Sequence, residues 1–375
     1  MHLGLAGGST TGPGGRGGAR RGAQRCRNRD VTRPQRRAPS VGPVLATAEP
    51  LLRHYWYPLA FAEDLPAGPL ARRLLGTDLV LWQGPDGRPA AARDRCPHRE
   101  AALSGGWAAG GRVVCPYHGW EFGADGRCEL IPQNAPGQRP NPRAVLETFN
   151  ATTALGMVWV CLSPEPWGGI PVLPEHGAQG WRTVREFDVE WPCGAPHLLD
   201  NNLDLAHFAF VHQGTFGRPE SPRVDPTTVE RTAFGMVARS GADVAARPGE
   251  TVATKRVMTS EVHAPFTGLL RIRYPDGLEH VIVKAIAPVD DGTCRLLQVA
   301  VRNDSEDQRP GADIVAFDTA VGVEDLAILA RVPADFPTAI GALVHIDTDK
   351  ASVAYRRLLG EVVSGAWRPD PVLAG

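Results

Sequence analysis

The sequence predicts an α+β protein in which a small all-β domain precedes a larger domain built from an antiparallel sheet and helices. Two observations predict this order. Short β-rich runs separated by turn residues follow one another from about residue 50 to residue 165. Long β-rich runs joined by Asp-Gly pairs, and then two segments of helical periodicity, lie after residue 175. A twisted antiparallel sheet with helices on one face is the assembly that these later elements favour.

Residues 1–43 are rich in glycine, arginine and proline and show no hydrophobic periodicity, so we expect a disordered tail. The first forty residues hold nine arginines and one acid, a charge of +8, whereas the remainder holds 31 basic and 40 acidic residues, a charge of −9. An export signal and a nucleic-acid-binding tail are the functional alternatives. No apolar stretch follows Arg20-Arg21, so we favour a solvated tail or a start codon assigned too far upstream.

The composition is that of a globular protein with a sizeable core. The 375 residues suggest two domains, and 43% of them are hydrophobic. No run of about 18 apolar residues occurs, and the net charge is −1, so we expect no membrane or nucleic-acid partner. Seven scattered cysteines are an odd number and predict no disulfide framework. They indicate a reducing compartment, and we expect a cytoplasmic protein.

The all-β domain is predicted to span residues 50–165. Its β-rich runs alternate with turn residues such as Pro85-Asp86-Gly87, and a linker rich in proline and glycine follows it over residues 164–174. The predicted strands are Tyr55–Ala60, Leu70–Leu75, Leu79–Gln83, Ala90–Arg93 and Met157–Leu162.

The second domain is predicted to span residues 175–370. Its first segment, Pro196–Phe210, has a helical pattern. Asp276-Gly277 and Asp291-Gly292 separate three β-rich runs, which is a strong hairpin signal. The predicted strands are Leu269–Tyr274, His280–Pro288 and Cys294–Asn303, and the predicted later helices are Ala312–Ala330 and Lys350–Val363.

Two short segments of the first domain pair a cysteine with a histidine. They contain Cys96 and His98, and then Cys115 and His118. Two cysteines and two histidines suit tetrahedral zinc, but zinc fingers usually pair like with like along the chain. The mixed arrangement favours a [2Fe–2S] cluster, in which one iron is held by both cysteines and the other by both histidines.

A second constellation lies in the predicted helix of the second domain. His207 and His212 are five residues apart, about 140° on a regular helix, so the helix must end or distort between them if both are to bind one metal. Two imidazoles and one carboxylate form the facial triad of non-haem Fe(II) oxygenases. Two histidines alone are more often structural, but Asp204 and Asn201 just before them favour a site.

Both constellations resemble motifs of one known family. Cys96-Pro-His98-Arg99 and Cys115-Pro-Tyr-His118-Gly-Trp120 resemble the cluster-binding loops of Rieske proteins. The loops lack the extra cysteine pair of respiratory Rieske proteins, so they are similar to the oxygenase branch. Asn201-x-x-Asp204-x-x-His207-x4-His212 resembles the mononuclear iron motif of Rieske oxygenases. The resemblance covers residues 50–365 and implies a Rieske domain followed by a catalytic domain of helix-grip type.

The resemblance also implies a third ligand, an aspartate in a late helix. Asp325 is the residue that we predict for it, and Asp318 is the second choice. Glu324 points about 100° away from Asp325 on a helix, so it is not our choice for the ligand. The family further implies a homotrimer, in which His118 of one subunit approaches Asp204 of the next while Asp204 orients His207.

The chain carries no G-x-G-x-x-G nicotinamide or flavin fingerprint, so we expect electrons from a separate NAD(P)H-dependent reductase, directly or through a ferredoxin. The segment from His207 to Gly217 is similar to that of vanillate demethylase and toluenesulfonate methyl-monooxygenase-type enzymes. This similarity implies O2-dependent hydroxylation or oxidative demethylation of a small ring-containing substrate. The alternatives are cis-dihydroxylation of an arene and, in another class, a Rieske electron-transfer protein.

The remaining histidines, His280 among them, have no partners at ligand spacing, and we expect them to be structural. Arg271 and Arg273 alternate along a predicted strand and therefore share a face. They could meet a substrate carboxylate, but we favour a solvated sheet face.

Overall fold

The computed structural model describes residues 43–244 and 254–370 of the 375-residue chain. The predicted tail, residues 1–43, lies outside the described residues except for its last position. The described chain forms three antiparallel sheets and then ends with two long helices. Its short 3-10 helices are η1 (Ala46–Ala48), η2 (Pro50–His54), η3 (Ala62–Ala67), η4 (Leu103–Gly105), η5 (Ile340–Ala342) and η6 (Asp347–Asp349).

The first sheet has six strands in the order β1-β10-β9-β4-β3-β2. The sequence predicts five of these strands and misses β9, because threonine and asparagine fill that strand and weaken its hydrophobic alternation. The strands are β1 (Tyr57–Phe61), β2 (Leu70–Leu74), β3 (Thr77–Gln83), β4 (Pro89–Arg93), β9 (Thr148–Ala154) and β10 (Met157–Cys161).

A small four-stranded sheet in the order β5-β6-β7-β8 carries the cysteine and histidine pairs. Cys96 and His98 lie in the loop between β4 and β5, and Cys115 and His118 lie in the loop between β6 and β7. The strands are too short for a periodic signal, having two or three residues each. They are β5 (Trp107–Ala109), β6 (Arg112–Val114), β7 (Glu121–Phe122) and β8 (Cys128–Leu130).

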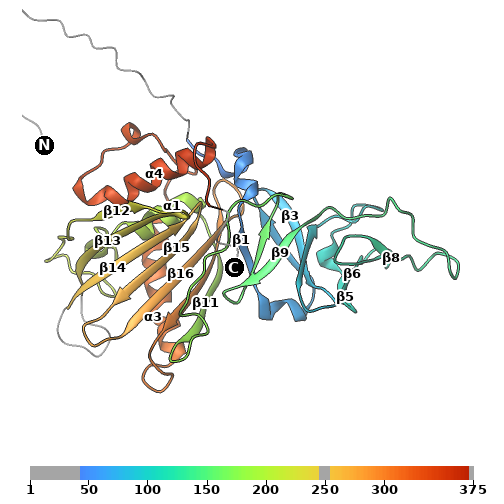
Figure 1. The fold of residues 1–375 in the computed structure, drawn as a ribbon, viewed down its shortest axis with the longest axis horizontal. Coiled ribbons are helices and arrows are strands. Elements are labelled where there is room, and N and C mark those ends of the chain that lie inside the picture. The colour runs from blue at the N-terminus through green and yellow to red at the C-terminus, as the bar shows by residue number, and fades with distance from the viewer. Residues whose placement is uncertain (1–42, 245–253, 371–375) are drawn as a thin grey trace, which may run out of the picture. The chain divides into compact units, whose positions relative to one another are not determined.

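The third sheet has seven antiparallel strands in the order β11-β17-β16-β15-β14-β13-β12, drawn from green to orange in Figure 1. The predicted Asp-Gly turns join β15 to β16 and β16 to β17, as the sequence indicates. Four strands of this sheet were not apparent from the sequence, because charged and small residues interrupt their alternation. The strands are β11 (Arg182–Trp191), β12 (Thr228–Arg231), β13 (Gly235–Val244), β14 (Thr254–His263), β15 (Thr267–Arg273), β16 (Glu279–Pro288) and β17 (Cys294–Arg302).

The two faces of the seven-stranded sheet have different partners. One face presents Leu269, Val283 and Val299, which pack in one buried cluster with Phe61 and Trp159 of the six-stranded sheet. Successive side chains of a strand point to opposite faces, so the alternate residues of the same strands face the other way. That second face lines the cavity that contains the candidate site.

Four α-helices complete the fold: α1 (Ala195–Leu203), α2 (Phe208–Val211), α3 (Gly311–Leu329) and α4 (Lys350–Val363). The predicted helices Ala312–Ala330 and Lys350–Val363 agree with α3 and α4 to within one residue. Figure 1 shows α3 running behind the strands of the large sheet. The prediction of one continuous helix over Pro196–Phe210 was wrong, because α1 ends at Leu203 and Asp204 has extended backbone angles, φ −86° and ψ 120°.

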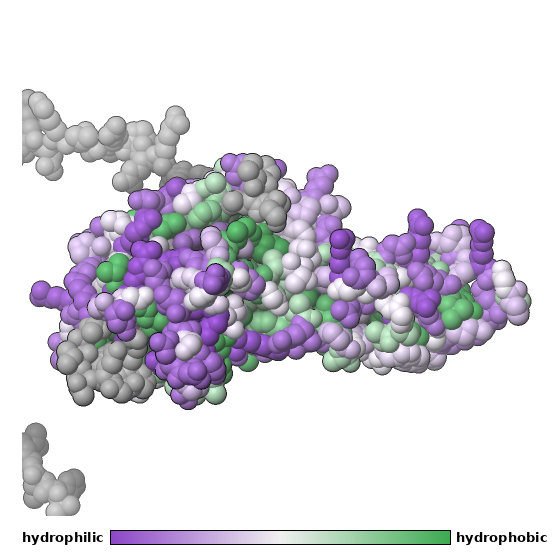
Figure 2. Space-filling view, turned by 60° about the horizontal axis from the view of Figure 1, so that its bottom comes forward, coloured by the Kyte–Doolittle hydropathy of each residue, from purple (hydrophilic) through white to green (hydrophobic). Residues whose placement is uncertain are grey.

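No helix in the described residues has both the length and the apolar composition needed to cross a membrane. The face of the molecule drawn in Figure 2 mixes hydrophilic residues with smaller hydrophobic patches.

Candidate active site

A break in the helical segment brings the two predicted metal-binding histidines together. After α1 ends, His207 forms the N-terminal cap of the one-turn helix α2, and His212 forms its C-terminal cap. The backbone at His212, with φ −93° and ψ 31°, has left the helical conformation, which is what the five-residue spacing requires. The Gly217 N–H donates to the His212 carbonyl at 2.6 Å and closes the turn.

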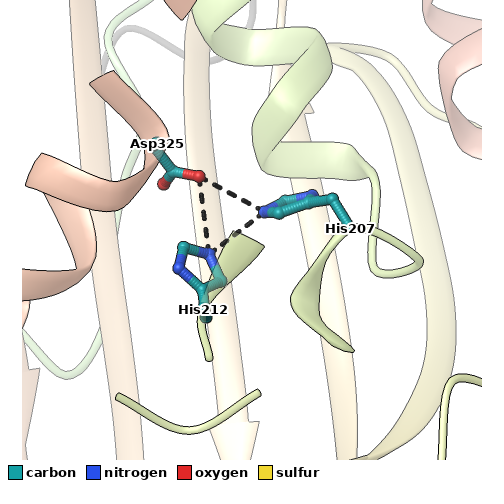
Figure 3. Close-up of side chains that lie close together, drawn as sticks. All are labelled: His207, His212 and Asp325. Atoms are coloured by element: carbon teal, nitrogen blue, oxygen red, sulfur yellow. Dashed lines mark hydrogen bonds and ion pairs between the residues drawn. The ribbon is translucent and has the colours of Figure 1, made fainter. Parts of the chain in front are cut away.

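His207, His212 and Asp325 converge, as Figure 3 shows. The two Nε2 atoms are 3.1 Å apart, and each lies 3.4 Å from Oδ1 of Asp325. Metal–ligand bonds of about 2.1 Å, at angles between 90° and the tetrahedral angle, separate two donor atoms by about 3.0–3.4 Å. The arrangement therefore fits a single metal ion on one side of the three donors. All three side chains are at least 88% buried, since their exposed fractions are 12%, 1% and 7%.

Glu324 is not one of the three convergent donors, but its side chain reaches one of them. Its Oε2 accepts a hydrogen bond at 2.9 Å from Nδ1 of His212, the ring nitrogen that does not face Asp325. Thr215 Oγ1 and the Gly214 N–H also donate to this carboxylate, at 2.7 and 2.9 Å. The long glutamate side chain spans the angular offset on the helix, and it fixes the orientation of the His212 ring.

His207 has its own carboxylate partner. Oδ2 of Asp204 lies 3.5 Å from Nδ1 of His207, a distance that suits an electrostatic contact more than a short hydrogen bond. The Ala206 N–H donates to the other Asp204 oxygen at 2.8 Å. Burial disfavours the charged imidazole, but Asp204 and Asp325 outweigh it and raise the pKa of His207 to about 9. Asp204 is 35% exposed, so one part of it faces outward.

Asn201 and Asp318 take different positions around the three donors. Asn201 Nδ2 donates to Oδ1 of Asp325 at 3.3 Å and so holds the carboxylate in place. Asp318 lines the same cavity as Asp325 but is not one of the three convergent residues. Burial, followed by the contact with Asp318, raises the pKa of Glu186 to about 10.

The loops around Cys96 and Cys115 have the same backbone geometry. In each loop the cysteine carbonyl accepts from the N–H four residues later, at 2.9 and 3.0 Å. Its own N–H donates to the carbonyl five residues later, at 2.9 Å in both loops. The fourth residue after each cysteine, Glu100 or Gly119, has a positive φ, of 64° or 69°. Two matching loops thus present two cysteines toward one place.

The side chains of these loops fit a cluster with mixed ligands. Both thiols are 1% exposed, and burial raises the pKa of Cys96 to about 11, with the adjacent Cys115 thiol adding to the shift. The rings of His98 and His118 are 4.5 Å apart. The Nδ1 atoms of both rings are buried without a hydrogen-bond partner among the described residues. Unpartnered buried nitrogens beside buried thiols are the donors that a [2Fe–2S] cluster with two cysteines and two histidines requires.

Comparison with family models agrees with this pair of centres. Residues 55–150 match the Rieske [2Fe-2S] domain, and residues 191–365 match the vanillate O-demethylase oxygenase C-terminal domain. The chain belongs to the Rieske-type non-haem iron oxygenases and is an oxygenase component. Such a protein is an oxidoreductase that carries a [2Fe–2S] cluster and a mononuclear Fe(II), and it receives electrons from a separate reductase.

Similar proteins include methylxanthine N1-demethylase NdmA of Pseudomonas putida, which is 31% identical over 324 residues, 83% of this chain and 89% of the relative. The dicamba O-demethylase oxygenase component of Stenotrophomonas maltophilia is 36% identical over 171 residues, 43% of this chain and 48% of the relative. The structure of Pseudomonas putida CBB5 NdmA with caffeine is similar with a TM-score of 0.75 at 29% identity, over 85% of this chain and 93% of that one.

A cavity of about 110 Å³ opens beside the three convergent donors, between α3 and the large sheet. Helix α3 lines it with residues three or four positions apart, which is one face of a helix. Those residues are Ile314, Phe317, Asp318, Val321 and Asp325. Phe208 and Phe216 form the wall next to His212, with ring centres 5.6 and 4.7 Å from the imidazole. No sequence pattern indicates this cavity, because its lining comes from residues distributed between positions 201 and 325.

Proposed function

We propose that this oxygenase component uses O2 and reductase-derived electrons to hydroxylate or oxidatively demethylate a small ring-containing organic substrate. The observation that carries the proposal is the largely apolar cavity that opens onto His207, His212 and Asp325. The names of NdmA and dicamba O-demethylase, an N-demethylase and an O-demethylase, support demethylation as the outcome. The alternatives are cis-dihydroxylation of an arene and, in another class, a Rieske electron-transfer protein.

We infer that residues 175–370 hold the mononuclear iron through His207, His212 and Asp325. The iron supplies open positions for dioxygen. Glu324 holds the ring of His212, and Asn201 holds the Asp325 carboxylate, so that the three donors keep their spacing. Neutral imidazole is the form that binds a metal. Burial favours it at His212 by lowering the pKa of that ring, whereas the neighbouring carboxylates raise the pKa of His207, so that iron must displace a proton there.

We infer likewise that residues 50–165 hold the [2Fe–2S] cluster through Cys96, His98, Cys115 and His118. The cluster stores one electron for the mononuclear site. The buried thiols and the unpartnered Nδ1 atoms support this ligand set. A ferredoxin between the reductase and the cluster is part of the proposal, as is a cytoplasmic location. The six described cysteines, which form no disulfides, suit a reducing compartment.

Asp204 is the proposed connection between the two centres in a homotrimer. It contacts His207, and its side chain is 35% exposed, as a contact with His118 of a neighbouring subunit would require. A carboxylate shared by two imidazoles would fix both rings and raise their basicity as ligands.

The test of this connection is Asp204→Asn, which keeps the size of the side chain and removes its charge. We expect normal cluster and iron content, normal cluster reduction by the reductase, and turnover that is lower by orders of magnitude. Cluster reoxidation in a single turnover, with pre-reduced enzyme, substrate and O2, is the measurement. A wild-type reoxidation rate would contradict the connection, and loss of the mononuclear iron would make Asp204 a support for His207 alone.

The function itself is tested with purified protein, NADH, a surrogate reductase and a panel of methoxy- and N-methyl-substituted ring compounds. We expect about three iron atoms per chain, two in the cluster and one at the mononuclear site. Formaldehyde and a demethylated product should appear together, and only with O2. A cis-diol would instead show dioxygenation. Two irons per chain and no product with any compound would indicate an electron-transfer protein.

A further inference from the structure

The cavity beside the proposed iron site has two ends of different chemistry. Strand β16 faces it with every second residue, His280, Ile282 and Lys284. Lys284 lies at the end next to the proposed iron site, which we call the iron end. Its Nζ donates to Asn202 Oδ1 at 2.5 Å. His280 lies four residues away, about 13 Å along the strand. The wall between these ends is apolar and is formed by Met258, Leu270, Ile272, Ile282, Ile314 and Phe317.

The acids that line the cavity lie at the iron end. Asp318 and Asp325 both act on Lys284, since each opposes the lowering of its pKa that burial causes. The lysine and these acids therefore balance one another within one cluster. The lining of the other end is basic.

Three arginines and one histidine line the far end, which we call the basic end and define as Arg256, His280, Arg302 and Arg309. His280 and Arg302 are cross-strand partners on β16 and β17. Arg309 comes from the opposite wall, two residues before α3 begins. The guanidinium groups thus approach from both the sheet and the helix side.

Two acids near the basic end pair with the same arginine, Arg182, which lies outside that end. Asp304 accepts hydrogen bonds from Arg302 and, at 2.8 Å, from Arg182, so one carboxylate serves two guanidinium groups. Glu306 pairs with Arg182 but is 68% exposed, and solvent screens that pair. Within the described residues, the Arg309 side chain has no ion-pair partner. Arg309 is therefore the cation that is available to a ligand.

His280 adds a buried polar side chain to the same lining. The residue is 5% exposed, and its Nε2 has no hydrogen-bond partner within the described parts of the chain. Burial, followed by the charge of Arg302, lowers the pKa of His280 to about 3, with Arg309 and Arg256 adding to the shift. The neutral ring can therefore donate an N–H. A buried polar atom without a partner is costly, and a bound acceptor would remove that cost.

We propose that the substrate of this oxygenase is an anion whose carboxylate lies between Arg309, Arg302 and His280, while the carbon that is oxidised lies at the far side of its ring, beside the iron site. The inference rests on the proposed function and adds the chemical class of the substrate. A guanidinium group binds a carboxylate through two parallel N–H donors, which favours a planar anion over a neutral amide. The separation of the two ends requires the anionic group and the oxidised carbon to lie at opposite ends of the ring system.

Arg271 and Arg273, the arginines that the sequence suggested for a substrate carboxylate, do not line this cavity. Arg271 pairs with Glu175 and Glu279, and Arg273 pairs with Glu279. Arg273 is 65% exposed in its side chain and lies on β15, next to β16. It is therefore a matched control for a loss of positive charge near the cavity.

The experiment measures binding to the iron-loaded enzyme by titration calorimetry, with two acid–amide pairs as probes. The pairs are 4-methoxybenzoate with 4-methoxybenzamide, and 6-methoxy-2-naphthoate with its amide. We expect the acid of at least one pair to bind about tenfold more tightly than its amide, as one charge-assisted contact implies. The ortho isomer, 2-methoxybenzoate, should lose this advantage because its two groups are adjacent.

Three variants assign the preference to the basic end. Arg309→Gln should weaken binding of the acid about tenfold and leave the amide unchanged. Arg309→Lys should have an intermediate effect, since it keeps the charge and loses the paired donors. Arg273→Gln should leave the binding of both the acid and the amide unchanged. The cluster absorption spectrum and the iron content check that each variant is folded.

The proposal is overturned if neither acid outbinds its amide, if no probe binds, or if Arg309→Gln and Arg273→Gln have equal effects. Formaldehyde release separates this result from the proposed function. Demethylation of amides and acids alike, without a charge preference, would leave the function standing and remove the charge inference. Arg309-dependent binding of acids without any oxygenated product would support the charge inference and contradict the proposed function.

Discussion

Glu324 and Asp325 are adjacent on α3, yet they serve the three convergent donors from different sides. Asp325 faces His207 and His212 directly, whereas Glu324 reaches the outer nitrogen of His212. One helix thus provides both a proposed ligand and the support for another ligand. Substitution of each residue should therefore affect iron binding in a different way.

Glu324→Gln should weaken iron binding about 10- to 100-fold and leave the cluster unchanged. The amide can still accept from His212, but its NH2 group would face the donors Thr215 and Gly214 and disrupt the arrangement. Iron retention during titration with a chelator is the measurement. Asp313→Asn, an exposed change in the first turn of α3, is the control and should retain iron as the wild type does. Equal retention in both variants would show that Glu324 is dispensable.

Asp325→Ala should remove one iron per chain and abolish turnover while the cluster spectrum persists. The variant deletes the only carboxylate oxygen that lies 3.4 Å from both histidine nitrogens among the described residues. Asp318→Ala should keep that iron, because Asp318 contacts Glu186 and is not part of the convergent trio. Iron analysis with the visible spectrum distinguishes the two. The opposite pattern would make Asp318 the third ligand.

The helical segment from α1 to α2 shows how a short element sets the geometry of the site. Its two breaks, at Asp204 and at His212, turn a spacing unsuited to a regular helix into convergent donors. Gly217 makes the second break possible. A β-carbon there would lie 2.3 Å from the Phe208 carbonyl oxygen and 2.7 Å from the His212 carbonyl carbon.

Gly217→Ala should therefore displace His212 and reduce iron occupancy, with the free energy of unfolding lowered by about 1–3 kcal/mol. Iron content and thermal unfolding of the apoprotein are the measurements. Gly341→Ala is the matched control, since a β-carbon at Gly341 meets no atom within 4 Å. If the two variants hold iron equally well, the close approach at Gly217 does not determine the position of His212.

Elements differ in how far the sequence predicts them. Helices α3 and α4 and strands β15–β17 carry continuous hydrophobic periodicity, and their ends agree with prediction to within two residues. Strand β11 lies at the edge of the sheet, and polar residues alternate irregularly along it. Strands β12–β14 contain serine, glycine and charged residues, so their pairing depends on neighbouring strands that are distant in sequence.

The whole molecule should fold without its arginine-rich beginning. Residues 1–42 have few apolar side chains, so they can bury little apolar surface. A chain that starts at Pro43 keeps Val44, which is 1% exposed and exchanges backbone hydrogen bonds with Phe336 at 2.8 and 3.2 Å. We expect this chain to bind iron and turn over as the full chain does.

A chain that starts at Ala46 lacks that pairing and should unfold about 1–3 kcal/mol more easily. Thermal unfolding and iron content of the two shortened chains are the measurements. Loss of the cluster from the chain that starts at Pro43 would show that the first residues contribute to folding.

The order of the two parts, the family and the residue types at both proposed metal centres follow from the sequence alone. Those features are local: Cys-x-His, Cys-x-x-His and the His207–His212 pair lie within short segments whose chemistry can be recognised without a fold. Asp325 could be selected only through the resemblance, because it lies 113 residues after His212.

The tertiary structure is needed to see which distant residues support the donors and which side chains line the cavity. Glu324 reaches His212 because α3 packs over the sheet, and the angular rule for neighbouring helix residues says nothing about the reach of a long side chain. The basic end arises because β16, β17 and the start of α3 meet around one cavity. Its members, His280, Arg302 and Arg309, have no pattern in sequence, since a cavity wall is defined by packing between elements and not by spacing along any one of them.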